Sequence, residues 1–545
     1  MLESLLQFSL LLIVILLLVM MARKVKIAYP ILLVVGGLVL SFVPGIPKIE
    51  IDPEIIFVVF LPPLLFEAAW QTSWKEFWKW RRVISSFAFL IVIVTALVVA
   101  VVAHSIIPGF TLALGFLLGG IISPPDAVAA SAVLKNVKVP KRLIAIAEGE
   151  SLLNDAASLV IFRFALIAVN TGTFVFTEAL GRFFIVIILG VLVGLAVSLV
   201  FYAIFRWLPT TSNMDILLTF IAPYVMYILA ESLHVSGVLA VVSGGLFLSA
   251  RSHKILGYRS RFQGEQVWST ISFALNGFIF LLIGLEWPVL IRELGAEGLP
   301  SAIRYGLIIS GMLIVLRLLC TFGASVFTVW VSRYITTADN KPGWKGPMLL
   351  GWAGMRGVVS LAAALSIPLH LSNGNPFPYR NLILFITFSV IVVTLVVQGL
   401  TLPWLARLLA QDDPDYPLSD KEQEIVLRRK MSAAALKAMQ ERYGDQFRTN
   451  CWVLSLESRL KSDVSMLDGI AIGMEAADGQ DDADGRLSTS YADYRKVYLD
   501  LVDEQRQLLE KMNKKEELDE RIIRKYHTLL DMEEEKLRRQ FGEDE

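Results

Sequence analysis

Apolar residues in this chain fall into long runs separated by short polar stretches, from the start of the sequence to about residue 410. Runs of about 20 predominantly apolar residues predict helices that cross a membrane. Thirteen such spans are predicted, at approximately residues 4–22, 27–43, 53–70, 83–107, 110–134, 143–169, 174–205, 214–233, 235–250, 265–287, 303–333, 346–369 and 380–409. The pattern therefore predicts an all-α polytopic membrane domain over residues 1–410.

The remainder, residues 411–545, is strongly polar and predicts a separate helical tail. A Pro- and Asp-containing linker covers residues 411–418, and segments 419–462 and 490–541 are rich in helix-forming residues. Lys and Arg are more frequent in the odd-numbered loops between spans, as in Lys135-Asn136-Val137-Lys138. Because basic loops stay on the cytoplasmic side, this bias predicts an external N-terminus and a cytoplasmic tail, a candidate regulatory segment.

Composition agrees with a membrane protein: 55% of residues are hydrophobic and 18% are charged, against about 25% in soluble domains. The formal net charge is zero and gives no argument for a nucleic-acid partner. The two cysteines lie in different parts of the chain, which argues against a structural disulfide, and the tail contains no nucleotide motif, metal-binding cluster or nucleophile elbow. We therefore expect neither an enzyme nor a cofactor.

Two of the predicted spans are interrupted near their middle. The fifth contains Ser123-Pro124-Pro125-Asp126, and the twelfth contains the glycine-rich segment 351–357. Consecutive prolines prevent a continuous helix, and three glycines weaken one. The breaks are seven spans apart, which fits two inverted six-helix repeats joined by one extra helix. Paired breaks in inverted halves indicate the binding site of a secondary transporter.

The sixth span carries the motif Gly149-Glu150-Ser151-Leu152-Leu153-Asn154-Asp155 near its midpoint. Charged groups at that depth are rare and usually functional. On a helix, Ser151 and Asp155 share one face, Asn154 lies beside it, and Glu150 points elsewhere. We expect Asp155 and Ser151 to face a cavity and Glu150 to need a buried partner.

Two arginines, Arg317 and Arg356, lie in the middle of later spans and are candidate partners for Glu150. We assign Glu150 to Arg317 as a structural ion pair, and Arg356 to the free carbonyl ends at the second break, where a cation is favourable. The opposite assignment remains an alternative.

Asp126, Asp155, Ser151 and Asn154 supply hard oxygen ligands without any His or Cys. Such ligands suit Na⁺, Li⁺, K⁺ or H⁺ better than a transition metal. Two carboxylates at one site can exchange a proton for a cation. Glu67, which follows Pro62-Pro63 near the cytoplasmic side, either lines a funnel to this site or reaches the membrane interface.

These motifs resemble the sodium/proton exchanger family, the cation/proton antiporter-1 group, in its bacterial branch. The resemblance covers roughly residues 10–410 and rests on segment 149–155, Ser123-Pro124-Pro125-Asp126, Gly354-Met355-Arg356-Gly357 and Leu61-Pro62-Pro63 with Glu67. Many relatives have Thr-Asp-Pro at the first break, whereas here Pro124-Pro125 precede Asp126 and Ala127 follows it. This departure leaves the preference between Na⁺ and K⁺ open.

The resemblance implies a homodimer with thirteen helices per subunit and an elevator-like movement of spans 4–6 and 11–13. It implies Asp155 as carrier of the cation and the proton, with Asp126 and Ser151 nearby and a Glu150–Arg317 structural pair. An Asn154–Asp155 sequence is typical of electroneutral members. A bacterial inner-membrane antiporter of Na⁺, or Li⁺ or K⁺, against H⁺ is thus expected, and a monovalent cation channel or a cation-coupled symporter are the alternatives.

Overall fold

In the part of the chain that it describes, the computed structural model is predominantly helical and contains no β-strand, only one isolated bridge between His370 and Pro376. The chain forms two compact units, Met1–Asp415 and Tyr416–Glu545. The structure describes residues 2–25, 27–42, 56–126, 130–131, 134, 139–172, 176–331, 343–409, 420–443, 451–476, 499, 501–503, 505–507 and 529–536.

The helices of the first unit follow the apolar runs of the sequence. They are α1 (Leu2–Val25), α2 (Tyr29–Leu40), η1 (Ile56–Phe60), α4 (Leu61–Gln71), α5 (Trp74–Ser85), η2 (Ser86–Ile91), α6 (Val92–Ile106), α7 (Leu112–Ile122), α9 (Lys141–Thr171), α10 (Phe176–Trp207), α11 (Ser212–Ser232), α12 (Gly237–Ser249), α13 (Ser252–Ile255), α14 (Tyr258–Val331), α15 (Lys345–Trp352), α16 (Val358–Leu365), α17 (Arg380–Val393), η3 (Thr394–Gln398) and α18 (Gly399–Leu408).

Among the described residues, eight helical segments are long and apolar enough to cross a membrane. They are Leu6–Val25, Trp74–Ile106, Lys141–Thr171, Gly181–Trp207, Ser212–Ser232, Tyr258–Arg292, Gly298–Val329 and Arg380–Leu408. Four shorter apolar helices accompany them, at Tyr29–Leu40, Val58–Gln71, Leu112–Ile122 and Gly237–Ser249. The unit is therefore an apolar helical bundle in which eight of the described segments match the thickness of a bilayer.

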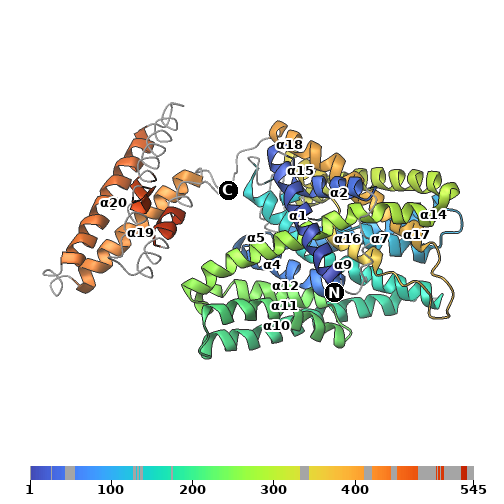
Figure 1. Ribbon diagram of the computed structural model, residues 1–545, viewed down its shortest axis with the longest axis horizontal. Coiled ribbons are helices and arrows are strands. Elements are labelled where there is room, and N and C mark those ends of the chain that lie inside the picture. Colours follow the sequence, from blue (N-terminus) through green and yellow to red (C-terminus); the bar gives the residue numbers. More distant parts are fainter. Residues whose placement is uncertain are drawn as a thin grey trace. The chain divides into compact units, whose positions relative to one another are not determined.

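Helix α9 lies between two apolar cores. One core is built around α4 and the neighbouring helices α10, α11 and α12, which lie side by side (Figure 1). The other joins α6, α7, α14, α17 and their neighbours. Leu152 and Ala156 of α9 belong to the first core, whereas Leu143 and Phe162 belong to the second. The helix that carries the central motif is thus held from both sides.

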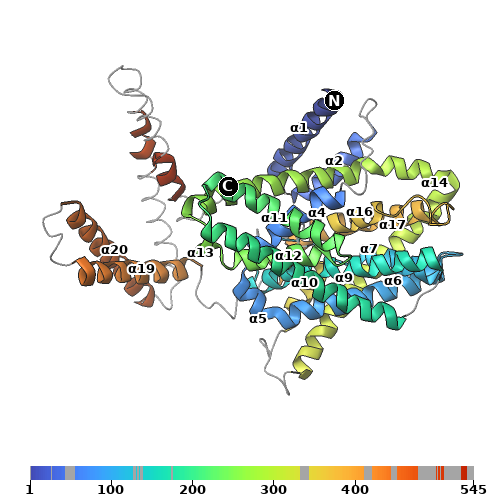
Figure 2. The same cartoon turned by 90° about the horizontal axis from the view of Figure 1, so that it is seen from below.

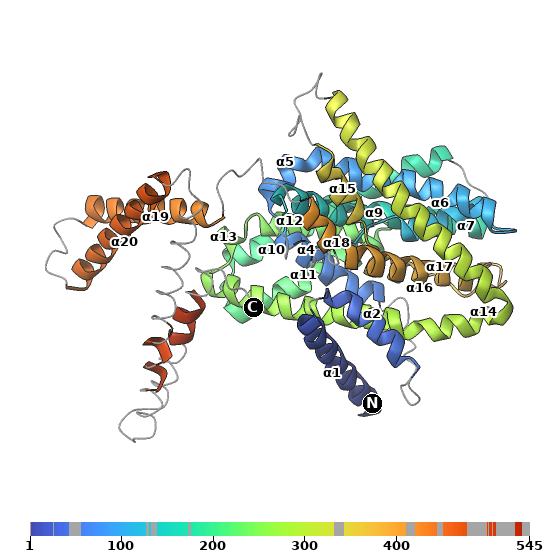
Figure 3. The ribbon, with the colours of Figure 1, turned by 90° about the horizontal axis from the view of Figure 1, so that it is seen from above.

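Close helix packing in the second core depends on small residues. Gly115 and Gly119 of α7 face Ala100 and Ala96 of α6, and a methyl group on either glycine would lie 2.6 Å from the facing alanine carbonyl oxygen. Small residues four apart allow helix backbones to approach closely in apolar surroundings. Helix α1 lies at the edge of the unit, where it contacts α2 and α14 (Figures 2 and 3).

One span begins well before its predicted start, and two predicted spans share one helix label. The predicted span 83–107 begins earlier, because Ser73 caps α5, accepting a hydrogen bond from the Glu76 N–H at 3.5 Å, and α5 continues through η2 into α6. The basic residues of α5 hide this start from an apolar-run analysis. The predicted spans 265–287 and 303–333 correspond to the two helical parts of α14 on either side of Gly295, where φ is 71° and the helix is interrupted.

Both predicted breaks are present. Helix α7 ends at Ile122, and Ser123 to Asp126 are non-helical. Helices α15 and α16 are separated by the non-helical segment 353–357. The part of span 5 beyond Asp126 lies largely outside the described residues.

The second unit contains α19 (Asp420–Tyr443) and α20 (Cys451–Ala476), which pack against each other. A single helix over residues 419–462 was expected; instead α19 ends at Tyr443, next to Gly444 in the sequence, and α20 extends beyond the predicted end. Arg506 forms ion pairs with Asp503, Asp531 and Glu534. The linker 411–418 and most of segment 490–541 fall outside the described residues.

Candidate ion-binding site

A cavity of about 330 Å³ lies where α4, α9 and α14 meet the two breaks. Asp126, from the first break, and Asp155, from α9, both line it. The other lining residues are Tyr29, Leu61, Leu64, Leu65, Glu67, Ala68, Gln71, Thr72, Pro124, Pro125, Ser131, Glu148, Ser151, Leu152, Ser269, Ser272, Phe273, Asn276, Gly357, Val358, Val359 and Ser360. Carboxylate, hydroxyl and amide oxygens therefore surround one space inside an apolar bundle.

Helix α9 presents one polar face to this cavity. Glu148, Ser151 and Asp155 are spaced by three and four residues and all line the cavity, so they form one stripe along the helix. Asp155 is buried, with an exposed fraction of 7%. The shared face of Ser151 and Asp155 is the one that their spacing predicts.

Asp126 is positioned by the second break. Its backbone N–H donates a hydrogen bond to the carbonyl of Met355 at 2.7 Å. Its carboxylate lies so close to Gly357 that a methyl group on that glycine would overlap it. The site thus needs a residue without a side chain at position 357.

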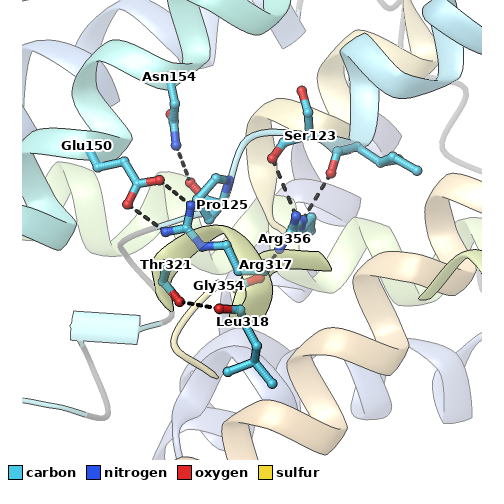
Figure 4. Close-up of polar contacts among 10 residues, drawn as sticks. Ser123, Pro125, Glu150, Asn154, Arg317, Leu318, Thr321, Gly354 and Arg356 are labelled. Carbon is cyan, nitrogen blue, oxygen red and sulfur yellow. Dashed lines mark hydrogen bonds and ion pairs between the residues drawn. The ribbon is translucent and has the colours of Figure 1, made fainter. Parts of the chain in front are cut away.

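Glu150 points away from the cavity and is paired with Arg317 of α14. The guanidinium donates two hydrogen bonds to the carboxylate, from Nη1 to Oε1 at 2.5 Å and from Nη2 to Oε2 at 2.6 Å (Figure 4). Both side chains are buried. This bidentate pair joins α9 to α14 and neutralises a charge that would otherwise be isolated in the bundle.

Arg356 donates hydrogen bonds to carbonyl groups at both breaks. Its Nε donates to the carbonyl of Ile122 at 3.0 Å, its Nη2 to that of Ser123 at 3.4 Å, and its Nη1 to that of Gly354 (Figure 4). The expected role at the second break is therefore extended, because Arg356 also reaches the end of α7 at the first break. One guanidinium connects both interrupted helices.

Asn154 is fully buried and does not line the cavity. Its side-chain amide donates a hydrogen bond to the carbonyl of Pro125 at 3.0 Å (Figure 4). That carbonyl immediately precedes Asp126 in the chain. The structure thus connects Asn154 to the first break, whereas the sequence placed it among the ion ligands.

The fold also brings Glu67 and Glu148 to the cavity. Glu67, on α4, accepts a hydrogen bond from the side-chain amide of Gln71. Glu148 accepts one from the hydroxyl of Ser131 at 3.3 Å. The sequence left two locations open for Glu67, a funnel to the site or the membrane interface. In the structure, Glu67 lines the cavity.

Charge balance limits what this site can do. Around the two breaks stand three carboxylates, of Glu150, Asp126 and Asp155, and two guanidinium groups. The Glu150–Arg317 pair is neutral by itself, whereas the carboxylates of Asp126 and Asp155 face the cavity. Ionised carboxylates without a counter-charge are unfavourable inside an apolar bundle, and a proton or a monovalent cation at the cavity would offset that charge.

The family of the chain follows from a match over most of its length. A family model described as "Sodium/hydrogen exchanger, transmembrane" matches residues 10–408. The chain belongs to the sodium/hydrogen exchanger family.

Several relatives of this exchanger-family chain are named antiporters. It is 34% identical over 449 residues to the "Sodium, potassium, lithium and rubidium/H(+) antiporter" of Bacillus pumilus, a match that covers 80% of the chain and 65% of the relative. It is also 34% identical over 389 residues to the "Low-affinity Na(+)/H(+) antiporter NhaS1" of Synechocystis. That match covers 70% of the chain and 69% of the relative.

A solved structure has the same fold. The sodium proton antiporter MjNhaP1 from Methanocaldococcus jannaschii at pH 8 matches with a TM-score of 0.60 and 18% identity, covering 74% of this chain and 98% of that one. At this identity the comparison supports the fold alone. Residue roles in the present exchanger-family chain rest on its own geometry.

Sequence reasoning did not single out several residues of this exchanger-family site. Glu148 shares the helical face of Ser151 and Asp155, so its spacing was a usable signal. Ser272 and Asn276 of α14 are uncharged, and a hydroxyl or amide in an apolar helix is a weak signal in a single sequence. Only the packing of α14 against the cavity brings these two residues to the site.

Proposed function

We propose that the protein is a secondary active antiporter that exchanges a monovalent cation, Na⁺ or alternatively Li⁺ or K⁺, for H⁺. The observation that carries this proposal is the cavity between two broken helices, lined by both Asp126 and Asp155. The named antiporter relatives support the same reaction.

Exchange follows from competition for the same oxygens. A cation binds at the carboxylates of Asp155 and Asp126 with the hydroxyl of Ser151, and protons compete for those carboxylates. Because an unloaded site carries an uncompensated charge, its passage through the apolar bundle is disfavoured. Only the cation-loaded or protonated site changes sides, and this couples the two fluxes.

The remaining polar residues form a frame for the site. Glu150 with Arg317 fastens α9 to α14, Arg356 joins the two breaks, and Asn154 fixes the backbone before Asp126. Glu67 serves as an entry residue of a cytoplasmic funnel. In this proposal the core spans 4–6 and 11–13 move together in an elevator-like alternation of access, and one charge is exchanged for one, so transport is electroneutral.

We place the protein in a bacterial inner membrane as a homodimer, where it would serve pH and sodium homeostasis. The paired breaks support two inverted repeats within thirteen membrane helices, with the N-terminus outside and residues 411–545 in the cytoplasm. In the single chain most of the apolar surface of α1 and α10 is unburied, and we propose that a second subunit covers part of it.

Purified protein in proteoliposomes tests the function. With an imposed pH gradient and a clamped membrane potential, addition of Na⁺, Li⁺ or K⁺ should move protons against the cation, at a rate that the potential does not change. Cation flux without proton movement would instead indicate a channel. Proton movement in the same direction as the cation would contradict antiport.

A further inference from the structure

One helix of the cavity wall carries a row of uncharged polar residues. Ser269, Ser272 and Asn276 of α14 are spaced by three and four residues and all line the cavity. This spacing puts them on one face of the helix. Ser269 is exposed, whereas Ser272 and Asn276 are 5% and 6% exposed, so the row leads from the surface into the buried part of the wall.

The two buried residues have oxygen atoms without protein partners. In the part of the chain that the structure describes, neither the hydroxyl oxygen of Ser272 nor the amide oxygen of Asn276 has a hydrogen-bond partner. Buried polar atoms are almost always hydrogen-bonded, so the exceptions require an explanation. An ion held in the cavity would supply the missing interaction.

Other hydroxyl groups of α14 behave differently. Ser310, which is also buried, donates to the carbonyl of Gly306 at 2.6 Å, and Thr270 donates to that of Gln266 at 2.9 Å. This return to the preceding turn is the usual arrangement for a hydroxyl in a helix. Ser272 departs from it on the side of the helix where the cavity lies.

The facing walls carry the charged groups. Helix α4 contributes Glu67, and α9 contributes Glu148 and Asp155. The α14 face therefore adds neutral oxygens to a space that already holds several carboxylates. Neutral oxygens replace part of an ion's hydration shell without adding another group for protons to compete for.

We propose that Ser272 and Asn276 form a neutral subsite that binds the dehydrated monovalent cation opposite Asp155 and Asp126. This inference rests on the proposed antiport function and extends its binding site to α14. The subsite contributes to affinity and to discrimination among Na⁺, Li⁺ and K⁺, and it does not carry the proton.

The test uses the full-length protein in proteoliposomes and compares Ser272→Ala/Asn276→Leu with the parent. The KM for the transported cation should rise about tenfold while the rate at saturating cation stays within about twofold, as expected for removal of contacts that stabilise the bound state and the transition state equally. The ratio of KM values for Na⁺ and K⁺ should also change. Ser272→Thr keeps the hydroxyl and should keep the low KM, and Ser310→Ala is the matched buried control.

Cation-induced thermal stabilisation in detergent gives a second readout that does not need transport. Single Ser272→Ala and Asn276→Leu variants should each require higher Na⁺ concentrations for the same rise in unfolding temperature. If neither the KM nor the Na⁺-induced rise in unfolding temperature changes, the subsite is overturned, and the two oxygens interact with water alone. A different result would also overturn the subsite: a fall in both the maximal rate and the thermal stability measured without Na⁺, while KM stays constant. These two residues would then have a packing role.

The two proposals fail in different ways. Absence of cation/proton exchange in the parent protein would contradict the antiporter itself. Exchange in the parent with the same KM in the double variant would contradict the α14 subsite alone.

Discussion

Arg356 donates a hydrogen bond from Nε to the carbonyl of Ile122, the last residue of α7, at 3.0 Å. The two residues belong to different broken helices and are far apart in the sequence. Through this contact and those to Ser123 and Gly354, one guanidinium satisfies carbonyl groups of both breaks. The fixed fork of five donors in Arg makes such a connection feasible, whereas Lys offers a single point charge.

Replacement of Arg356 by Lys should therefore destabilise the protein despite the conserved charge. Each buried carbonyl left without a donor costs about 1–3 kcal/mol, so a loss of about 3 kcal/mol is expected. Thermal or denaturant unfolding in detergent measures it, with the exposed Arg206→Lys on α10 as control. Equal unfolding free energies for Arg356→Lys and the parent would show that these contacts do not hold the breaks.

The Glu150–Arg317 pair predicts strong coupling between two substitutions. Glu150→Gln or Arg317→Gln alone leaves one buried charge without its partner, which costs about 3–5 kcal/mol. The double variant removes both charges and should be about 2 kcal/mol more stable than the sum of the single effects implies. A double-mutant cycle of unfolding free energies measures this coupling. Additive effects would mean that the pair is not a structural fastening.

The close approach of Gly357 to the carboxylate of Asp126 predicts that a larger residue at position 357 weakens cation binding. In Gly357→Ala the new methyl group would displace the carboxylate of Asp126, so the KM for the cation should rise at least about tenfold in a folded protein. Gly323→Ala on α14, where a methyl group would meet nothing within 4 Å, is the control and should behave as the parent. Parent-like transport by Gly357→Ala would argue that Asp126 does not bind the cation.

Local sequence patterns were sufficient for the breaks and for the faces of α9. Pro124-Pro125 and Gly354 to Gly357 interrupt helices through their own backbone chemistry, and helical spacing alone separates Asp155 from Glu150. The Glu150–Arg317 contact was also expected, because few charges lie in the apolar spans and each needs a partner.

Tertiary contacts determined what the sequence did not indicate. The reach of Arg356 to Ile122 depends on how α7 and the second break meet, and the bond from Asn154 to Pro125 depends on the packing of α9 against the first break. The continuity of α5 with α6 was hidden by the basic residues of α5.

Asp155 is central to the account, and substitution by Asn tests it most directly. Asn keeps the size of the side chain but removes the charge that a proton or a cation would balance. The measurement is cation-driven proton movement in proteoliposomes with matched amounts of folded protein. Asp215→Asn serves as the control, because Asp215 is a buried carboxylate of α11 that accepts a hydrogen bond from Ser260 and lies outside the cavity. The account predicts no exchange by Asp155→Asn and retained exchange by Asp215→Asn; robust exchange by Asp155→Asn would contradict it.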